Sequence, residues 1–416
     1  MWFPSPKIQQ TLYYSAFLIA AAGIHISPAL ASIGVIIMIV MGFFFLSGEA
    51  QERRIIRLQM AFGGLAVFLF AMDCMSGTSA GNAWSALQVM LPWFFLPVIM
   101  KGAQKLTIRP DVIFLVLTIP LCWIAGASLL NYLRDFDFLS QMVLESKPLP
   151  LYTDVYHIEF SMLITVVLLG MTFYFPQIKN SPYKIHLYVL YALLFLALHM
   201  ISARTGLLGY WLGILIWILS LLKSKDSLRK VNPWVAIGSV LAVLVLLVQI
   251  PSLKNRIVNT GEDLNALFNG GNLNHKSIGQ RVEAWKATGG IIKESHNFWT
   301  GVGTAQFDAQ LQESYERQKT SLWVSNRIGP HNQILQWMAT YGVFATIAWF
   351  ALIIALLLHQ LGPVAALMIG LPLWAASIFE SIAQRQAGTL AVVIGLVVFQ
   401  LVQHQRENIK KISPIN

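Results

Sequence analysis

The residue with the clearest chemical potential is His331, which stands in the segment Gly329-Pro330-His331-Asn332. This segment ends a polar stretch, residues 251–332, and directly precedes a long apolar run. Glycine and proline indicate a turn, so we expect the imidazole near the N-terminus of the following helix. The helix dipole there disfavours the imidazolium and attracts anions, which suits a general base beside a phosphate group. The other eight histidines lack such a context, and His331 alone is a candidate catalytic base.

Two arginines could hold the anion. Arg204 lies between two apolar runs, where a charge is costly unless it has a partner or a water-filled cavity. The ordinary explanation is an interfacial arginine whose charged end reaches the membrane surface. Arg281, taken alone, reads as a helix-surface residue. Together with His331 they indicate a phosphate-bearing substrate, because guanidinium groups bind phosphate through paired hydrogen bonds.

Weaker candidates complete the site. Glu380 and Arg385 lie in the short segment between the last two apolar runs. A mutual ion pair is the favoured reading, and a cleft beneath the polar stretch is the alternative. Asn332 and Trp285 are candidate cleft residues, and Asp73 is a weaker one of the same kind. No cluster of metal ligands and no nucleotide-binding or nucleophilic-serine motif occurs, so neither a metal nor a cofactor is expected.

The elements that must position these residues are membrane helices. The chain is 56% hydrophobic and 12% charged, which excludes a soluble domain of ordinary composition. Apolar runs long enough to cross a hydrocarbon core of ~30 Å as helices recur throughout. The first run reads as a retained helix rather than a removed signal peptide. We predict an all-α integral membrane protein with about twelve spans, at residues 11–25, 28–46, 58–72, 85–100, 112–130, 158–175, 185–201, 206–222, 233–250, 333–357, 361–378 and 387–403.

Charge sets the orientation. More than half of the 29 Lys and Arg residues fall in alternate loops and at the termini, which twelve spans place together on the cytoplasmic side. The first two spans could instead be one long bent helix. Two helices are favoured, because one span fewer would no longer place the basic loops and both termini on the same side. The net charge of +10 is then topogenic and does not indicate a nucleic-acid partner. His331 and both arginines consequently share the outer face of the membrane.

The predicted organisation has four parts. Within the polar stretch, helical periodicity covers residues 281–294, and glycines at positions 301 and 303 mark a break. This stretch therefore reads as a mostly helical, folded segment. The parts are nine transmembrane helices in 1–250, an outer (periplasmic) loop domain in 251–332, three transmembrane helices in 333–403 and a cytoplasmic tail in 404–416.

Three short motifs, in order between about residues 200 and 345, carry a family resemblance. The motifs are Ser202-Ala203-Arg204-Thr205-Gly206; Arg281-x-x-x-Trp285 followed by Gly301-x-Gly303-x-x-x-Phe307; and His331-Asn332-x-x-Leu335-Gln336 with Gly342. They resemble segments of the O-antigen ligase and polymerase superfamily of polytopic bacterial glycosyltransferases. The first 200 residues resemble that superfamily only in hydropathy.

The resemblance implies a GT-C-like fold in the bacterial inner membrane and a periplasmic active site. The donor would be an O-antigen glycan on undecaprenyl pyrophosphate, and the acceptor would be lipid A–core oligosaccharide, giving lipopolysaccharide. His331 would deprotonate or orient the acceptor hydroxyl, while Arg204 and Arg281 would hold the pyrophosphate. The transfer would invert the anomeric carbon without metal or cofactor. Membrane lipids are the other expected partners, and no obligate protein partner is evident.

Alternatives stay open at this stage. An O-antigen polymerase and an O-linked protein oligosaccharyltransferase of the same superfamily differ only in acceptor, and nothing in the sequence excludes either. A twelve-helix transporter or flippase is the alternative from another class. The polar candidates gather at the outer surface, whereas transporter sites usually lie near the bilayer midplane, and this disfavours transport.

Overall fold

The computed structural model describes residues 5–46, 52–106, 109–144, 149–178, 181–223, 238 and 251–412. Within these ranges, the regular secondary structure is helical. The α-helices are α1 (Pro6–Ile26), α2 (Pro28–Phe44), α3 (Glu52–Met75), α4 (Ala80–Phe94), α5 (Leu96–Gln104), α6 (Pro110–Arg134), α7 (Phe136–Leu144), α8 (His157–Ile178), α9 (Lys184–Ile201), α10 (Arg204–Lys223), α12 (Pro251–Phe268), α13 (Ser277–Lys293), α14 (Ser295–Thr300), α15 (Thr304–Arg317), α16 (Gln333–Gln360), α17 (Gly362–Phe379) and α18 (Gln386–Ile412). Short 3₁₀ turns, η1 and η2, cover Val324–Asn326 and Ile382–Gln384.

The bundle is that of an all-α polytopic membrane protein. Nine helical segments within the described residues are long and apolar enough to cross a membrane. They are α3, α4 continued by α5, α6, α8, α9, α10, α16, α17 and α18. The predicted span at 233–250 lies outside the described residues, apart from position 238. α18 continues to Ile412, past the predicted end of the last span.

The first two predicted spans fall on two separate helices, α1 and α2, neither of which is among the nine span candidates. α1 ends at Ile26, Ser27 is extended, and Pro28 begins α2. The two helices pack closely through glycines: a Cβ added at Gly34 would lie 2.5 Å from the backbone nitrogen of Ala20. The alternative of one long bent helix is therefore wrong.

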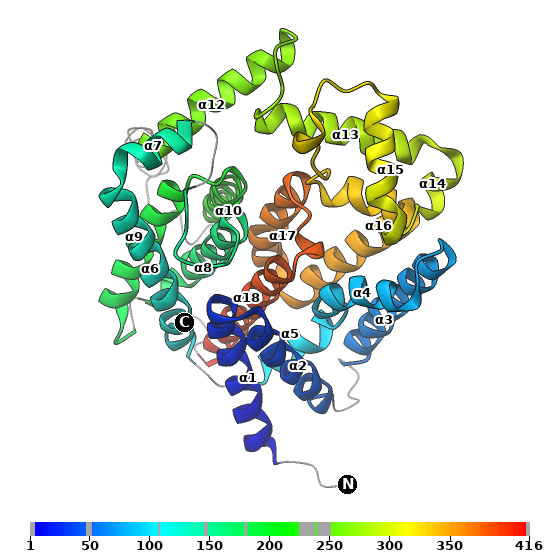
Figure 1. Cartoon of the computed structure of the whole chain (residues 1–416). Helices are drawn as coiled ribbons and strands as arrows, with labels where there is room; N and C mark the ends of the chain where they lie inside the picture. The colour runs from blue at the N-terminus through cyan, green and yellow to red at the C-terminus, as the bar shows by residue number, and fades with distance from the viewer. Residues whose placement is uncertain are drawn as a thin grey trace.

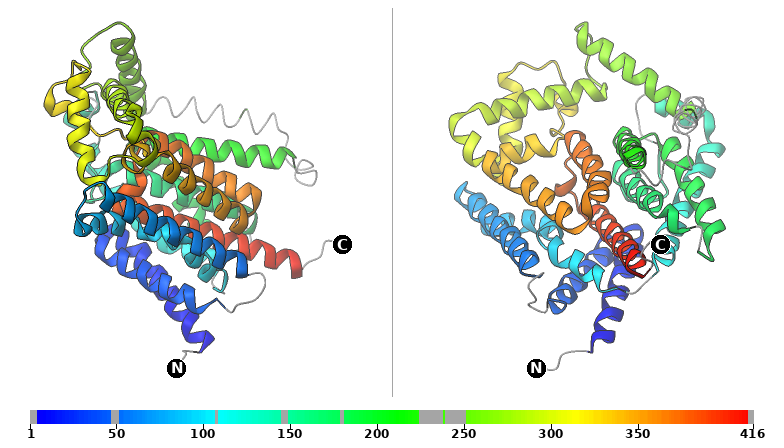
Figure 2. Two further views of the ribbon diagram at one scale, coloured as in Figure 1. Left: turned by 90° about the vertical axis from the view of Figure 1, so that its right-hand side faces the viewer. Right: turned by 180° about the vertical axis from the view of Figure 1, so that it is seen from behind.

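The polar stretch forms helices that cover one end of the bundle. α13, α14 and α15 lie together over the start of α16, and α12 extends across to α7 and α9 (Figures 1 and 2). These helices enclose a small hydrophobic core of their own around Ala284, Ile291, Phe307 and Tyr315.

Hydropathy alone did not indicate α7, because a helix of nine residues is too short to span a membrane.

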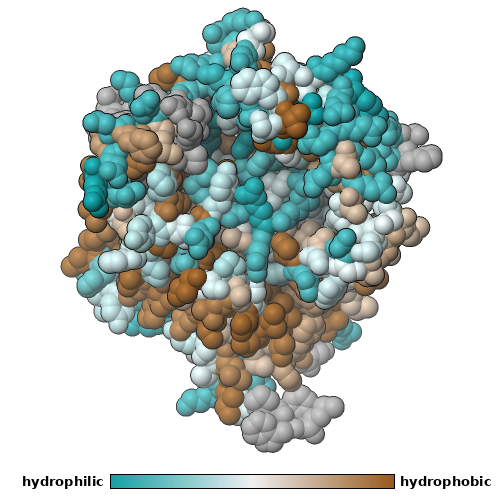
Figure 3. All heavy atoms as spheres, in the orientation of Figure 1, coloured by the Kyte–Doolittle hydropathy of each residue, from teal (hydrophilic) through white to brown (hydrophobic). Residues whose placement is uncertain are grey.

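The covered end is also the polar end. Figure 3 views the molecule from this side and shows hydrophilic residues gathered over the α12–α15 region, with hydrophobic residues along the opposite rim. Aqueous contact at this end, and lipid contact around the bundle, follow from that distribution.

Backbone contacts fix the outer helices to α16. Val302 and Gly303 donate hydrogen bonds to the carbonyls of Ala339 and Thr340, at 2.8 and 2.9 Å. Gly342 has φ +81° within α16, and a Cβ there would lie 2.0 Å from the carbonyl oxygen of Trp299. Glycine is required at this position, because any side chain would meet the backbone of α14 and a left-handed conformation is unfavourable for other residues. The outer helices are therefore held in register with the segment that carries His331.

Candidate active site

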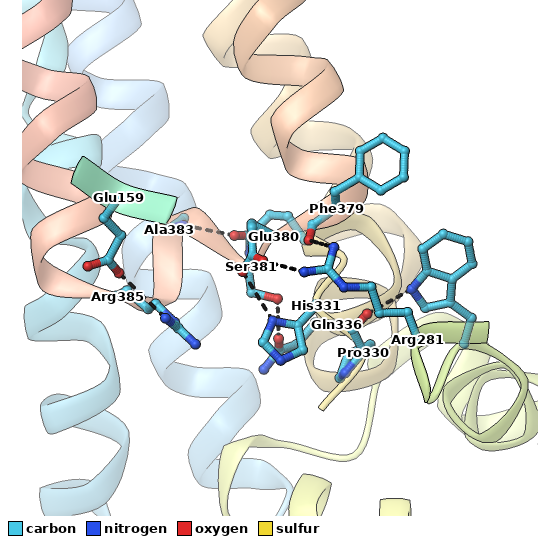
Figure 4. A network of polar contacts seen from close by, with 12 residues as sticks. Glu159, Arg281, Pro330, His331, Gln336, Phe379, Glu380, Ser381, Ala383 and Arg385 are labelled. Carbon is cyan, nitrogen blue, oxygen red and sulfur yellow. Dashed lines mark hydrogen bonds and ion pairs between the residues drawn. The ribbon is translucent and has the colours of Figure 1, made fainter. Parts of the chain in front are cut away.

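His331 and Glu380 meet where α16 begins and α17 ends. His331 lies two residues before α16, and Glu380 directly follows α17. The imidazole Nδ1 lies 3.1 Å from Glu380 Oε2 (Figure 4). Because an ionised carboxylate can only accept, the hydrogen-bonding pattern assigns the proton to Nδ1 and leaves Nε2 as an acceptor. No motif in the sequence identified a carboxylate partner for His331, and Glu380 takes that position.

The backbone of His331 is strained. Its φ is +43°, in the left-handed region that residues other than glycine seldom adopt. Asn332 then caps α16, because its side-chain oxygen accepts a hydrogen bond from the Leu335 backbone nitrogen at 3.0 Å. Asn332 is thus a helix cap and does not contact the cavity described below. The cap and the unusual turn together aim the imidazole at Glu380.

Arg281 joins this pair from the outer helices. Its Nη2 lies 2.8 Å from Glu380 Oε1, and its Nη1 donates to the Phe379 carbonyl at 2.7 Å. The two oxygens of Glu380 are therefore shared between a guanidinium and an imidazole (Figure 4). Arg281 was expected from sequence to bind substrate, and the structure adds a carboxylate partner.

The environment keeps Glu380 ionised. The side chain is buried, with 4% of its surface exposed. Burial alone raises the pKa of Glu380. The hydrogen bond with His331 and the charge of Arg281 lower it by more than burial raises it, so the net pKa lies below its ordinary value of 4.5. A charged carboxylate at neutral pH can both orient the imidazole and stabilise its protonated form.

A cavity of about 310 Å³ lies beside this network. It is lined by parts of α8, α10, α13 and α17, including Arg204, Arg281 and Trp285. Trp285 also donates its indole Nε1 hydrogen to the Pro330 carbonyl at 2.7 Å, and thereby ties the cavity wall to the turn before His331. The structure brings both candidate arginines and Trp285 to one cavity. His331 and Glu380 do not line this cavity; Glu380 contacts Arg281, and His331 contacts Glu380.

Arg204 carries unused hydrogen-bonding capacity. Its Nε and Nη2 are buried without a hydrogen-bond partner among the described residues. The nearest carboxylate is that of Asp263 on α12, at 3.9 Å from Nη2. Asp263 is fully buried and accepts a hydrogen bond from the Ile278 backbone nitrogen. Asp263 was not among the candidate residues, because only the fold brings it, on α12, close to Arg204 at the start of α10.

Arg385 belongs to a second ion pair. Its Nη1 lies 3.8 Å from Glu159 Oε1 at the start of α8, and its guanidinium lies over the Tyr156 ring at 4.8 Å. The expected pair between Glu380 and Arg385 is therefore wrong. η2 turns the chain between the two residues, so Glu380 faces Arg281 while Arg385 faces α8 (Figure 4).

Two glutamines hold the Glu380 segment in place. Gln333 accepts a hydrogen bond from the Ala383 backbone nitrogen at 2.8 Å, and Gln336 accepts one from the Ser381 hydroxyl at 2.5 Å. Gln333 and Gln336 are three residues apart on α16 and so lie on one face. Gln336 belonged to the motif that carried the resemblance, but its partner could not be read from sequence.

An apolar cavity of about 420 Å³ opens on the other side of α17, between α16 and α17. Trp93, Trp349 and Trp374 contribute to its lining, and Ser377 lies at the end nearest Glu380. Ser377 and Glu380 are three residues apart, about one helical turn. The outer end of α17 thus separates a cationic cavity from an apolar one.

The family comparison covers part of the segment that carries this site. Residues 189–350 match the family model described as O-antigen ligase. The matched segment contains Arg204, Arg281 and His331, and it ends before Glu380 and Arg385. No curated protein in the comparison matches the chain. Over residues 189–350, the chain is similar to the O-antigen ligase family.

Proposed function

We propose that this membrane enzyme transfers an O-antigen glycan from undecaprenyl pyrophosphate to lipid A–core oligosaccharide at the periplasmic face of the inner membrane. The observation that carries the proposal is the position of Glu380, which contacts both His331 and Arg281. Glu380 thereby links the candidate base, His331, to Arg281, which lines the cationic cavity. The family match supports the class of reaction, and the acceptor is our inference.

In the proposed reaction, the acceptor hydroxyl oxygen attacks the anomeric carbon of the donor sugar from the face opposite the pyrophosphate. The bond between that carbon and the pyrophosphate oxygen breaks, and its electron pair leaves with undecaprenyl pyrophosphate. The hydroxyl proton passes to Nε2 of His331, and the configuration inverts. Glu380 stabilises the imidazolium that forms, because its carboxylate stays charged at neutral pH.

The arginines stabilise the leaving group. Arg204 has two buried nitrogens without a hydrogen-bond partner in the described part of the chain, and it lines the same cavity as Arg281. Hydrogen bonds from a guanidinium to phosphate contribute ~1.5–3 kcal/mol each and strengthen as charge develops on the leaving oxygen. This supply of positive charge supports transfer without a metal ion.

The two cavities suit two lipid-anchored substrates. We assign the pyrophosphate to the cavity of Arg204 and Arg281. The apolar cavity between α16 and α17 is open to a hydrocarbon chain whose head group reaches the membrane surface beside Glu380. A reaction between two membrane lipids requires such an arrangement, because both reacting groups must meet at the same surface.

An in vitro transfer assay tests the proposal. Purified protein is given undecaprenyl-pyrophosphate glycan, in EDTA, with lipid A–core, free glycan or a pilin-like protein as separate acceptors. We expect transfer to lipid A–core only, and none with the His331→Ala variant. Elongation of the glycan would identify a polymerase, and modification of the protein alone would identify a protein oligosaccharyltransferase. No transfer to any acceptor would favour the transporter alternative.

A further inference from the structure

A groove between α3 and α16 lies apart from the site described above. Its middle part is an apolar hollow of about 490 Å³, lined on α3 by Ala61, Gly64 and Phe68 among others. On α16 it is lined by Phe344, Ala345, Ala348, Ala351 and Leu352. Small residues on both helices leave this surface concave, and a Cβ added at Gly64 would meet no atom within 4 Å.

The same two helices form a second, basic hollow at the end of the groove. This hollow, of about 370 Å³, is lined by Arg54, Arg57, Leu58 and His359. Leu58 and Ala61 are three residues apart on α3, so the basic hollow lies next to the apolar one along this helix. His359 is near the C-terminal end of α16, at the opposite end of that helix from His331.

Among the described residues, no carboxylate pairs with the arginines in this hollow. Arg54 and Arg57 are exposed, and no ion pair involves either of them within the described residues. By contrast, neighbouring Lys101 pairs with buried Glu52 at 3.5 Å. The positive charge of the hollow is thus available to a ligand.

We propose that the groove between α3 and α16 binds one anionic phospholipid. Its phosphate contacts Arg54 and Arg57, and an acyl chain lies along the small residues toward Phe344. Basic pockets between transmembrane helices are suited to phospholipid head groups, while an apolar hollow alone would take any lipid. The lipid would brace α16, which begins beside His331, against α3. The proposal stands independently of the glycan transferred.

Native mass spectrometry tests the head-group contact. Protein purified in a neutral detergent is mixed with equal concentrations of phosphatidylglycerol or phosphatidylcholine. We expect the wild type to retain one phosphatidylglycerol in preference to phosphatidylcholine. Arg54→Gln/Arg57→Gln should lose ~30-fold in affinity for phosphatidylglycerol, as expected for two arginines at a membrane surface. Arg53→Gln is the matched control, because Arg53 is exposed on the same helix but does not line the hollow.

The control decides between a site and diffuse surface charge. Equal losses in Arg53→Gln and in the double variant would overturn the proposal, as would unchanged binding in the double variant. Each variant is first checked for an unchanged melting temperature without added lipid. A double variant that fails this check is replaced by Arg54→Lys/Arg57→Lys, which should retain phosphatidylglycerol if charge is what binds it.

A second pair of variants tests the acyl chain. Ala351→Phe fills the apolar hollow, whereas Ile347→Phe changes an exposed residue of α16 that does not line it. We expect a several-fold loss of phosphatidylglycerol binding in Ala351→Phe and none in Ile347→Phe. Glycerol 3-phosphate should not displace the lipid. Equal binding by the two phenylalanine variants, or displacement by glycerol 3-phosphate, would contradict a lipid seated in the groove.

Discussion

Two buried carboxylates join the membrane bundle to the outer helices, and they have different partners. Glu380, after α17, contacts Arg281 and His331. Asp73, near the end of α3, accepts hydrogen bonds from the backbone nitrogen and the hydroxyl of Thr304, at 2.6 and 2.5 Å, and from the Thr78 hydroxyl. Both residues are almost fully buried and both contact the outer segment.

The comparison shows that the partners, rather than the carboxylate, separate a structural joint from a candidate site. The partners of Asp73 are neutral: the Thr78 hydroxyl, and the hydroxyl and backbone N–H of Thr304 at the start of α15, where a carboxylate satisfies a free backbone N–H and complements the helix dipole. Glu380 has a guanidinium that lines a cavity and an imidazole that can accept a proton. Asp73 was a weak candidate in the sequence, and its contacts identify it as a helix cap.

The largest effect is expected at His331. His331→Ala should lower the transfer rate by about 10²–10⁴-fold, the range for removal of a general acid or base. Binding of the lipid-linked donor should be retained, because the cavity arginines are unchanged. Transfer assays and donor binding measured on the same preparation check this. Transfer at the wild-type rate would exclude His331 as the base.

Loss of a cavity arginine should have the next largest effect. Arg281→Ala should reduce transfer by about 10–100-fold, since one charge-assisted hydrogen bond contributes ~1.5–3 kcal/mol. Arg317→Ala is the matched control, because this exposed arginine of α15 pairs with Glu294, away from the cavity. Similar losses in the two variants would show that outer-helix charge, rather than the cavity, matters for transfer.

Glu380→Gln should reduce transfer by about tenfold, less than loss of His331, because an amide still contacts the ring but no longer stabilises the imidazolium. We expect the loss in kcat with little change in KM for the acceptor. A loss confined to KM would indicate that Glu380 shapes the binding site instead of assisting proton transfer.

The ionisation state of Glu380 can be followed by measuring the stability of the protein as a function of pH. Its pKa is below the ordinary value of 4.5, so the stability that its charge contributes is fully present above pH 4.5 and is lost as the pH falls through the lowered value. The melting temperatures of the wild type and Glu380→Gln should therefore differ at neutral pH and converge below about pH 4.5. Convergence already at pH 6 would contradict the lowered pKa.

The smallest effect on transfer is expected at Asp73. Asp73→Asn should change the rate by less than about twofold, yet lower stability by ~1 kcal/mol through the weakened helix cap. A thermal melt measures the second quantity and a transfer assay the first. A rate loss as large as that of Glu380→Gln would remove the distinction between the two carboxylates.

The sequence predicted the parts that depend on local pattern. Apolar runs of sufficient length gave an all-α membrane protein, because an unpaired backbone cannot cross a bilayer. The glycine and proline before His331 gave the turn at the start of α16. Short motifs around Arg204, Arg281 and His331 indicated the family that the comparison then matched.

Which charged groups meet depends on the tertiary fold. Glu380 is 49 residues from His331 and 99 from Arg281, and Asp263 approaches Arg204 through a helix that folds over the bundle. Such pairs depend on how α10, α13 and α17 converge at one end of the bundle. Hydropathy and spacing carry no information on this convergence, because each helix satisfies its own backbone hydrogen bonds and leaves the choice of neighbours to side-chain packing. The sequence therefore determined an all-α membrane protein and a candidate base, whereas packing determined the carboxylate partner of that base.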